Sequence, residues 1–405
     1  MKTDMLKYSL LTLVLAMLTL SACTEGDKFD YNKNVAYMTG TETSPLVKFV
    51  VEDTPSTYSV TVSLTDKVSE DVAVKFAMDN SLIEQYNKEN KTSYYPVPES
   101  AVELGNMDVV IKAGRASSTS TDVKIISTED FVDGRVYVIP ITIKEIAGGL
   151  EILEPSKTVF LRISRVIHFN SLDMNNTNLY SNYIAPDELA VNLPNYTYEI
   201  KCYVNNWHET PERISRLCSF TAKDESNSNM LRFGENGQDL NSLQWVSPAG
   251  SIVSTTRFTP GRWYMISLTY DGSKFTMYVD GVKDIEMAGS ANCTFQRLEL
   301  GMSWESYPAK QYFNGRIAEA RVWNRALTTG ELQLGLCGVD AAADGLVAYW
   351  KFDEGEGHIF HDCTKHGYDM DWSDTYRDTG NGVLSPFDKS SYVNWIFDDN
   401  NKCNQ

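Results

Sequence analysis

The sequence predicts an all-β fold in two successive domains with little helix. Short segments that alternate apolar and polar residues, or that are rich in β-branched residues, recur along most of the chain between turn signals. The chain has 405 residues, which is enough for two or three domains. Aromatic residues make up 11% of it, a supply that suits β-sheets and ligand-stacking surfaces.

The first 34 residues are expected to lie outside the folded domains. Two lysines precede a short apolar run that ends in Leu20-Ser21-Ala22-Cys23, the pattern of an export signal. The tetrapeptide resembles a bacterial lipobox, which implies that residues 1–22 are removed and Cys23 is lipidated. An ordinary signal peptide with a chance Cys is the alternative. The acidic tether that follows, 23–34, resembles the surface-export signal of glycan-foraging Gram-negative bacteria.

Residues 35–167 are predicted to form a β-sandwich, because several short strands follow one another at close spacing. The expected strands are YSVTVSL (58–64), DVAVKFAM (71–78), MDVVIKAG (107–114), VYVIPITI (136–143) and KTVFLRIS (157–164). Ser81 with Glu84 reads as a capping box that opens a short helix. Asp133-Gly134 is a turn signal.

The order of motifs in this domain carries a resemblance. SLIEQYNKENKTSYYPVPES, VVIKAGRASS, DGRVYVIPITI and SKTVFLRI look like the N-terminal sandwich of unknown function on lipoproteins of polysaccharide-utilisation loci. The resemblance covers about a third of the chain and implies a spacer or accessory module near the membrane.

The Asn- and Ser-rich segment 168–195 is interpreted as a junction, and strands resume at Tyr196. Residues 259–281, TPGRWYMISLTYDGSKFTMYVDG, alternate, turn at Asp271-Gly272, and alternate again, which predicts a β-hairpin with one buried face. Thr328 with Glu331 is a second capping box, so we expect a short helix that ends near Gly338.

The hairpin, LELG, FNGRIAEARVWNRALTTGEL and LVAYWKFDEGEG resemble the laminin G-like, concanavalin A-type jelly roll. The resemblance implies that residues 196–405 form a jelly roll with a lectin-like role. LVAYWKFDEGEG normally opens such a domain but comes last here. We therefore expect the 48-residue tail after Gly357 to complete the sheet.

Net charge and cysteine spacing argue against several classes of function. The net charge of −18 and the lack of basic runs argue against a nucleic-acid partner. Six cysteines follow Cys23 without a C-x-x-C pair, so a zinc ribbon or a thioredoxin motif is unsupported. Six cysteines allow fifteen pairings, and the sequence does not choose among them. Cys202–Cys218 is a hypothesis, because these two lie on strands expected to be neighbours.

A catalytic site is not evident. Jelly-roll glucanases use closely spaced carboxylates on one strand face, such as E-x-D-x-E, and no such run occurs. The H-E at 208–209 lacks the second His of a zinc protease, and Pro211 would break the required helix. A G-x-S-x-G motif and a Gly-rich phosphate loop are also absent.

Two kinds of binding site are predicted in loops. One is a structural calcium site, whose candidate ligands are Asp353, Glu354, Asp362 and Asp369. An acidic surface that binds no metal explains these residues equally well. A glycan platform needs an aromatic wall and planar hydrogen-bonding groups; its candidates are Trp207, His208, Glu209, Gln244, Trp245, Trp304, Glu305 and Tyr307, with Trp372 or Trp395 next. Trp323 and Trp350 lie in alternating strands and are expected in the core.

Together the resemblances imply an outer-membrane surface lipoprotein, facing the exterior, that captures glycans and is not an enzyme. N-glycans or mucin-type glycans are the expected ligands, and an outer-membrane glycan transporter complex is the expected partner. The alternatives are a glycoside hydrolase, or an accessory subunit of one, and a purely structural or adhesive protein.

Overall fold

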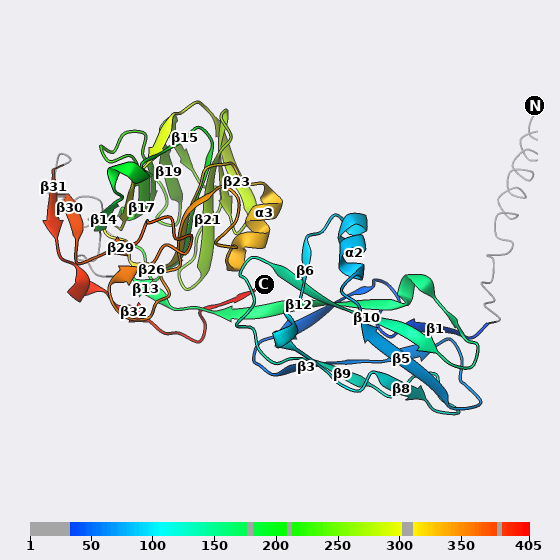
Figure 1. Cartoon of the computed structure of the whole chain (residues 1–405). Helices are drawn as coiled ribbons and strands as arrows, with labels where there is room; N and C mark the ends of the chain where they lie inside the picture. The colour runs from blue at the N-terminus through cyan, green and yellow to red at the C-terminus, as the bar shows by residue number, and fades with distance from the viewer. Residues whose placement is uncertain (1–32, 176–180, 209–212, 236, 302–310, 379–382) are drawn as a thin grey trace, which may run out of the picture.

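The computed structural model describes residues 33–175, 181–208, 213–235, 237–301, 311–378 and 383–405. They form two β-rich units joined near residue 170 (Figure 1), which confirms the predicted all-β fold. The predicted signal, lipidation and tether residues fall almost entirely outside the described chain. Within the described ranges, no helix is long and apolar enough to cross a membrane.

The N-terminal unit is the predicted β-sandwich. Its main sheet has the strand order β2-β12-β10-β5-β8, and two three-stranded sheets, β11-β1-β4 and β3-β9-β7, complete it. Side chains such as Met38, Phe76 and Ile125 bring these sheets together in one apolar core. The strands of this unit are β1 (Val35–Met38), β2 (Leu46–Val51), β3 (Ser56–Val60), β4 (Val62–Leu64), β5 (Val72–Met78), β6 (Tyr94–Pro96), β7 (Val102–Leu104), β8 (Asp108–Ile111), β9 (Thr121–Ile125), β10 (Val136–Ile146), β11 (Glu151–Ile152) and β12 (Thr158–His168).

The helices of this unit are α2 (Leu82–Asn90), η1 (Glu99–Ala101) and η2 (Glu154–Ser156). The helix predicted from Ser81 is present, but its capping box is wrong. Ser81 has helical backbone angles and makes no side-chain cap bond. Its hydroxyl instead donates to Asp79 Oδ1 at 2.5 Å, because an Asx turn at Asp79 already organises the entry to the helix.

The C-terminal unit consists of two large sheets packed on a shared core. One has the order β23-β22-β21-β16-β26-β13-β32 with β27 on β26, and the other β20-β19-β18-β17-β25-β14-β30-β31. The strands are β13 (Ser171–Asp173), β14 (Ser181–Ile184), β15 (Val191–Leu193), β16 (Tyr196–Val204), β17 (Ser215–Thr221), β18 (Asn229–Phe233), β19 (Leu243–Ser247), β20 (Gly250–Val253), β21 (Trp263–Tyr270), β22 (Lys274–Val279), β23 (Val282–Ala288), β24 (Cys293–Phe295), β25 (Arg297–Leu300), β26 (Gly315–Trp323), β27 (Leu346–Trp350), β28 (Ile359–Phe360), β29 (Met370–Asp371), β30 (Thr375–Asp378), β31 (Leu384–Phe387), β32 (Trp395–Ile396) and β33 (Lys402–Asn404). The helices are η3 (Asp187–Leu189), α3 (Thr329–Leu334), η4 (Gly335–Cys337) and η5 (Ser390–Tyr392).

The predicted junction, 168–195, requires a correction. It contains β13, which pairs with β26, and β14, which pairs with β25. The C-terminal unit therefore begins at Ser171, 25 residues before the predicted boundary at Tyr196. These strands have only three and four residues in a polar context, too short for a period-2 pattern to stand out.

The hairpin and the order of the last strands agree with prediction. β21 and β22 pair antiparallel, with Ile266 opposite Val279 and Tyr270 opposite Phe275. The LVAYW strand β27 pairs with β26, and the tail adds β30, β31 and β32 to the two sheets, so the tail does complete them. Thr328 forms the predicted capping box of α3 with Glu331.

Both faces of β16, β21 and β26 are buried, although the hairpin was predicted to bury only one. The second face carries charges. Glu319 is contacted by Arg321, by Lys201 Nζ at 3.1 Å and by the Tyr349 hydroxyl at 2.8 Å. Arg321 also lies 3.2 Å from Glu199, which accepts a 3.0 Å hydrogen bond from Trp323 Nε1. The α3–η4 segment covers this face, since Lys201 Nζ also donates to the Leu336 carbonyl at 3.2 Å.

The predicted Cys202–Cys218 disulfide is wrong. Both thiols are free and buried. Cys202 lies on β16 of one sheet and Cys218 on β17 of the other, and packed sheets stand about 10 Å apart. A disulfide requires Cα atoms within about 7 Å. The disulfide that forms is Cys337–Cys403, with a Cα–Cα distance of 5.4 Å.

Candidate functional site

An open recess lies beside Trp207, in the loop that follows β16. The Trp207 side chain is partly buried and packs on Phe233 of β18, with ring centroids 5.1 Å apart. The recess has a volume of about 530 Å³, and its other walls come from Arg213, Asp239, Leu240, Asn241 and Arg257. An aromatic side chain thus stands at the edge of a hollow rimmed by polar groups.

The polar rim is held by local bonds. Arg213 donates to the Gln238 carbonyl at 3.0 Å, and Arg257 donates to the Ser254 carbonyl at 2.9 Å. Arg257 also lies 3.5 Å from the carboxylate of Asp239, and both side chains are exposed. Guanidinium, carboxylate and amide groups can each bond two neighbouring hydroxyls, which is what a polyhydroxylated ligand needs.

His208 fastens this loop. Its Nε2 atom lies 2.7 Å from the Tyr312 carbonyl, and its ring meets the Tyr312 ring edge to face at 4.6 Å. The Ser215 hydroxyl donates to the same carbonyl at 3.2 Å. His208 therefore positions the Trp207 loop against Tyr312, and its predicted contact with a ligand stays a prediction.

Comparison with known families identifies the C-terminal unit. A family model described as the concanavalin A-like lectin/glucanases superfamily matches residues 176–333. The C-terminal unit is a concanavalin A-like domain. A second family model, which describes an N-terminal domain, matches residues 31–149.

Solved structures extend the comparison to most of the chain. A candidate carbohydrate-binding protein from Bacteroides ovatus ATCC 8483 is 22% identical with a TM-score of 0.60, covering 83% of this chain and 94% of that one. The chain therefore shares a fold with it over both units.

More distant similarities are confined to part of the chain. EndoBT-3987 from Bacteroides thetaiotamicron, bound to a Man5GlcNAc product, is 19% identical over 33% of this chain and 30% of that one, with a TM-score of 0.27. A pentraxin from Limulus polyphemus is 11% identical over 48% and 92%, with a TM-score of 0.35. No curated protein sequence matches the chain.

Two of the predicted stacking residues lie in the core of the concanavalin A-like domain. Trp245 is fully buried, and its Nε1 donates to Asn229 Oδ1 at 3.1 Å. Trp372 is 1% exposed. As exposed platform residues both predictions are wrong. Trp245 follows the alternation of β19, where Leu243, Trp245 and Ser247 all face inward, and its polar neighbours in sequence misled the interpretation.

The other residues predicted for the glycan platform or the core are partly buried, fully buried, or outside the described chain. Gln244 is partly buried and accepts a hydrogen bond from Arg232 Nε at 2.8 Å. Trp395 is partly buried and packs on Phe360. Glu209, Trp304, Glu305 and Tyr307 fall outside the described residues, so their place in a platform stays a prediction. Trp323 and Trp350 are buried as expected.

Sequence reasoning missed five residues that line the recess, Arg213, Asp239, Leu240, Asn241 and Arg257. Asn241 and Arg257 are far apart in sequence, but Phe258 N donates to the Asn241 carbonyl at 2.9 Å, which brings their loops together. In the sequence these residues stand in polar loops, one before β19 and one before the hairpin. No local sequence pattern shows that the two loops lie side by side.

The four predicted calcium ligands do not form a common set. Asp362 accepts bonds from the backbone of Tyr349, Thr364 and His366, and Asp369 accepts one from Asp362 N at 2.7 Å. These two carboxylates organise the turn after β28. Among the described residues, no group of three or more His, Cys, Asp or Glu side chains is arranged to hold a metal.

Asp353 and Glu354 are in a different environment. Burial raises the pKa of both carboxyls above their ordinary values. Glu354 Oε1 accepts a hydrogen bond from His361 N at 2.9 Å, while its buried Oε2 has no hydrogen-bond partner among the described residues. A buried carboxylate oxygen without a partner is costly, and a bound cation would offset that cost.

Proposed function

We propose that this protein captures glycans through the recess beside Trp207 on its concanavalin A-like domain, without transforming them. The observation that carries the proposal is the pairing of an aromatic wall with a rim of Arg, Asp and Asn groups around about 530 Å³ of open space. A sugar ring has an apolar C–H face that suits an aromatic side chain and a rim of hydroxyls that suits planar polar groups. The lectin-like fold and the shared fold with the candidate carbohydrate-binding protein support this.

The proposal is tested by calorimetry with a glycan selected on a glycan array. Affinity is expected in the micromolar to millimolar range, about −8 to −4 kcal/mol. Trp207→Ala removes the stacking wall and is expected to cost about 2 kcal/mol, roughly a 30-fold loss of affinity. Asn241→Ala and Arg257→Ala are expected to weaken binding by smaller factors.

Trp395→Ala is the matched control, because Trp395 is also a partly buried Trp of this domain but packs on Phe360, away from the recess. It is expected to bind like the parent protein. If Trp207→Ala is folded and binds normally while Trp395→Ala does not, the recess is not the site. Hydrolysis of the glycan by the parent protein would favour a glycosidase, and no binding to any glycan would favour an adhesive role.

A lipid anchor and a surface location belong to the same proposal. They depend on Leu20-Ser21-Ala22-Cys23 and on the acidic tether. Cys23→Ala is expected to leave the protein unprocessed or soluble, and unchanged membrane fractionation would remove the anchor from the proposal. N-glycans or mucin-type glycans, passed to an outer-membrane transporter complex, are the ligand and partner that we propose for such a lipoprotein.

Calcium near Asp353 and Glu354 also stays a proposal. A bound cation would offset the cost of burying these two carboxyls. Since a ligand that binds only the folded state raises its stability, EDTA is expected to lower the melting temperature and added Ca²⁺ to restore it. A melting temperature indifferent to both would contradict calcium binding.

A further inference from the structure

The last four residues of the chain cross from the concanavalin A-like domain to the N-terminal sandwich. β33 pairs antiparallel with the end of β12, with Val166 opposite Asn404 and His168 opposite Lys402. β33 therefore adds a strand to the main sheet of the other unit, and Figure 1 shows the C-terminus at the seam between the two.

Gln405 strengthens this attachment. Its backbone N–H donates to the Arg165 carbonyl at 2.9 Å, and its side-chain Oε1 accepts from Arg165 Nη2 at 2.8 Å. Its Nε2 donates to the Arg135 carbonyl at 3.0 Å, and the Ser164 hydroxyl donates to its backbone carbonyl at 2.7 Å. Residues 402–405 are therefore hydrogen-bonded to the N-terminal unit.

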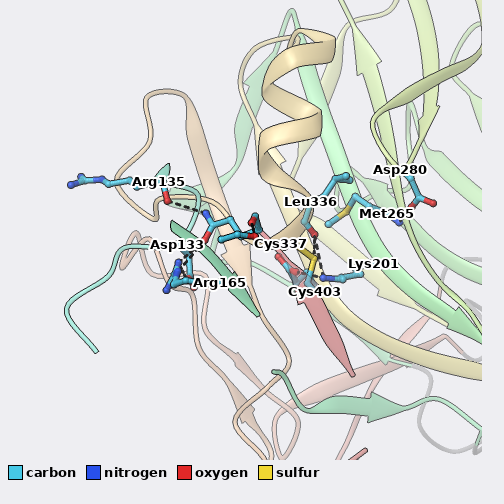
Figure 2. Close-up of a disulfide and its surroundings, with 12 residues drawn as sticks. Asp133, Arg135, Arg165, Lys201, Met265, Asp280, Leu336, Cys337 and Cys403 are labelled. Carbon is cyan, nitrogen blue, oxygen red and sulfur yellow. Dashed lines mark hydrogen bonds and ion pairs between the residues drawn. A yellow bond between two sulfur atoms is a disulfide. The ribbon is translucent and has the colours of Figure 1, made fainter. Parts of the chain in front are cut away.

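The disulfide ties this same strand to the other unit (Figure 2). Cys403 lies in β33, whereas Cys337 ends η4, which packs on the covered face of β16 through Lys201. β33 is thus hydrogen-bonded to one domain and covalently linked to the other. Cys337 is buried, but Cys403 is only partly buried, so a small reductant can approach the disulfide from that side.

Charged pairs and a close backbone approach line the rest of the seam. Asp133 of the N-terminal unit lies 3.1 Å from Arg165 and 2.6 Å from Lys351 of the other unit, and Arg135 lies 2.7 Å from Asp340. Gly134, at φ +75°, leaves room for the neighbouring backbone, because an added Cβ would stand 2.7 Å from Val339 Cα. The two units dock closely, and the charged pairs between them are partly exposed.

We propose that β33 and the Cys337–Cys403 disulfide form a redox-sensitive clasp that holds the two domains in one fixed orientation. A dithiol reductant would transfer two electrons and two protons to the S–S bond, giving two thiols on the protein and a cyclic disulfide on the reductant. Without the disulfide, β33 keeps its short ladder to β12, the bonds of Gln405 and the ion pair of Lys402 with Glu52, all to the N-terminal unit. The partly exposed charged pairs of the seam then hold the domains less firmly, and the domains separate about the connection near residue 170. The clasp is independent of what the concanavalin A-like domain binds.

Small-angle X-ray scattering of the whole protein tests the clasp. The double variant Cys337→Ser/Cys403→Ser is expected to show a larger maximum dimension and a broader distance distribution than the oxidised parent, while tryptophan fluorescence and near-UV circular dichroism stay native. Cys363→Ser, which removes a free, partly buried thiol, is the matched control and is expected to scatter like the parent. Superimposable curves for the folded double variant and the parent would overturn the proposal.

A second measurement covers the case in which the double variant fails to fold. The parent is treated with dithiothreitol without denaturant, and mass spectrometry after alkylation reports whether Cys337 and Cys403 have become reactive. Reduction with an expanded scattering profile supports the clasp. Reduction without expansion overturns its orienting role, and a disulfide that resists saturating reductant overturns its redox sensitivity.

Gly134→Ala tests the seam without touching the cysteines. The added methyl group pushes against Val339. The oxidised variant is therefore expected to stay compact, held by the disulfide, and to expand at a lower reductant concentration than the parent. Expansion of the variant while its disulfide is intact would show that the seam, and not the clasp, sets the orientation.

Discussion

The two units are both β-sandwiches, but their buried side chains differ in kind. The core of the N-terminal unit is mainly Val, Ile and Leu, it contains no Trp, and nearly all of its buried polar side chains are small. The C-terminal unit holds all eight tryptophans of the chain and many buried charges, among them Glu199, Lys201, Arg216, Arg297, Glu299, Glu319 and Arg321.

The units differ in what lies on the second, covered face of their main sheets. In the N-terminal unit, β5 alternates buried and exposed residues, and where α2 covers β10 and β12 the buried side chains are apolar, such as Val138 and Phe160. In the C-terminal unit the α3–η4 segment and the domain seam cover the second face of β16 and β26, so its charges must be paired. Buried ion pairs add little net stability but are costly to break. One of the paired groups also holds the covering segment, since Lys201 donates to the Leu336 carbonyl.

The largest expected effect comes from breaking a buried pair. Arg321→Met leaves the carboxylates of Glu199 and Glu319 without their main cation and is expected to lower the free energy of unfolding by about 3–5 kcal/mol. Urea unfolding followed by tryptophan fluorescence measures this, because every Trp lies in the C-terminal unit.

The matched change in the other unit is Lys112→Met. Lys112 pairs with Asp71 at 2.8 Å, but both side chains are more than half exposed, so a loss below about 1 kcal/mol is expected. Because the N-terminal unit contains no Trp, urea unfolding of this variant is followed by far-UV circular dichroism. Similar losses for the two variants would contradict the contrast between the units.

Acid is expected to weaken the C-terminal unit through Glu319. Burial alone would raise the pKa of this carboxyl, but Arg321 and Lys201 outweigh burial and lower it from 4.5 to about 2. A carboxyl with a lowered pKa stabilises the fold above its unfolded pKa and loses that contribution as pH falls through the folded value. About 3 kcal/mol is therefore expected to disappear between about pH 4.5 and pH 2.

The pH series is run with the same fluorescence-detected urea titration. Glu319→Gln is expected to remove this part of the acid sensitivity, although it lowers stability at neutral pH. If the variant and the parent lose stability in parallel below pH 4.5, other carboxyls account for the acid response.

The smallest effects distinguish the two helices. Thr328 accepts a hydrogen bond from Glu331 N within a complete capping box, so Thr328→Ala is expected to cost about 1 kcal/mol. Ser81 makes no such bond, so Ser81→Ala is expected to change stability by only a few tenths of a kcal/mol. Circular dichroism during thermal unfolding compares the two, and an equal loss would mean that capping is not what separates them.

Local patterns predicted the elements well where one short stretch holds the whole signal. The hairpin of β21 and β22 is marked by its own alternation and by Asp271-Gly272, and α3 by Thr328 and Glu331. Ser81 has the same spacing to Glu84, but nearby Asp79 takes over the turn. The pattern was present in both places, and only the surrounding chain decided the outcome.

Features that join distant segments could not be predicted. Glu319 and Arg321 alternate with Ala in β26 in the way that a solvent-exposed strand face does, and nothing local shows that α3 will cover them. Cys403 lies in a polar tail, 66 residues from Cys337. The recess also joins distant segments. Trp207 was identified from the loop between β16 and β17, which also carries Arg213, whereas Asp239 and Arg257 reach the recess from two other loops.

The pairing of β33 with β12 also imposes an order of events during synthesis. β12 is complete at His168, but the strand that lies beside its end is made of residues 402–404. While the ribosome adds the intervening residues, the end of β12 presents an unpaired strand edge, a feature that invites pairing with other chains. The nascent protein thus needs residues 402–404 before the edge of β12 can be covered, so products truncated before these residues are expected to aggregate more readily.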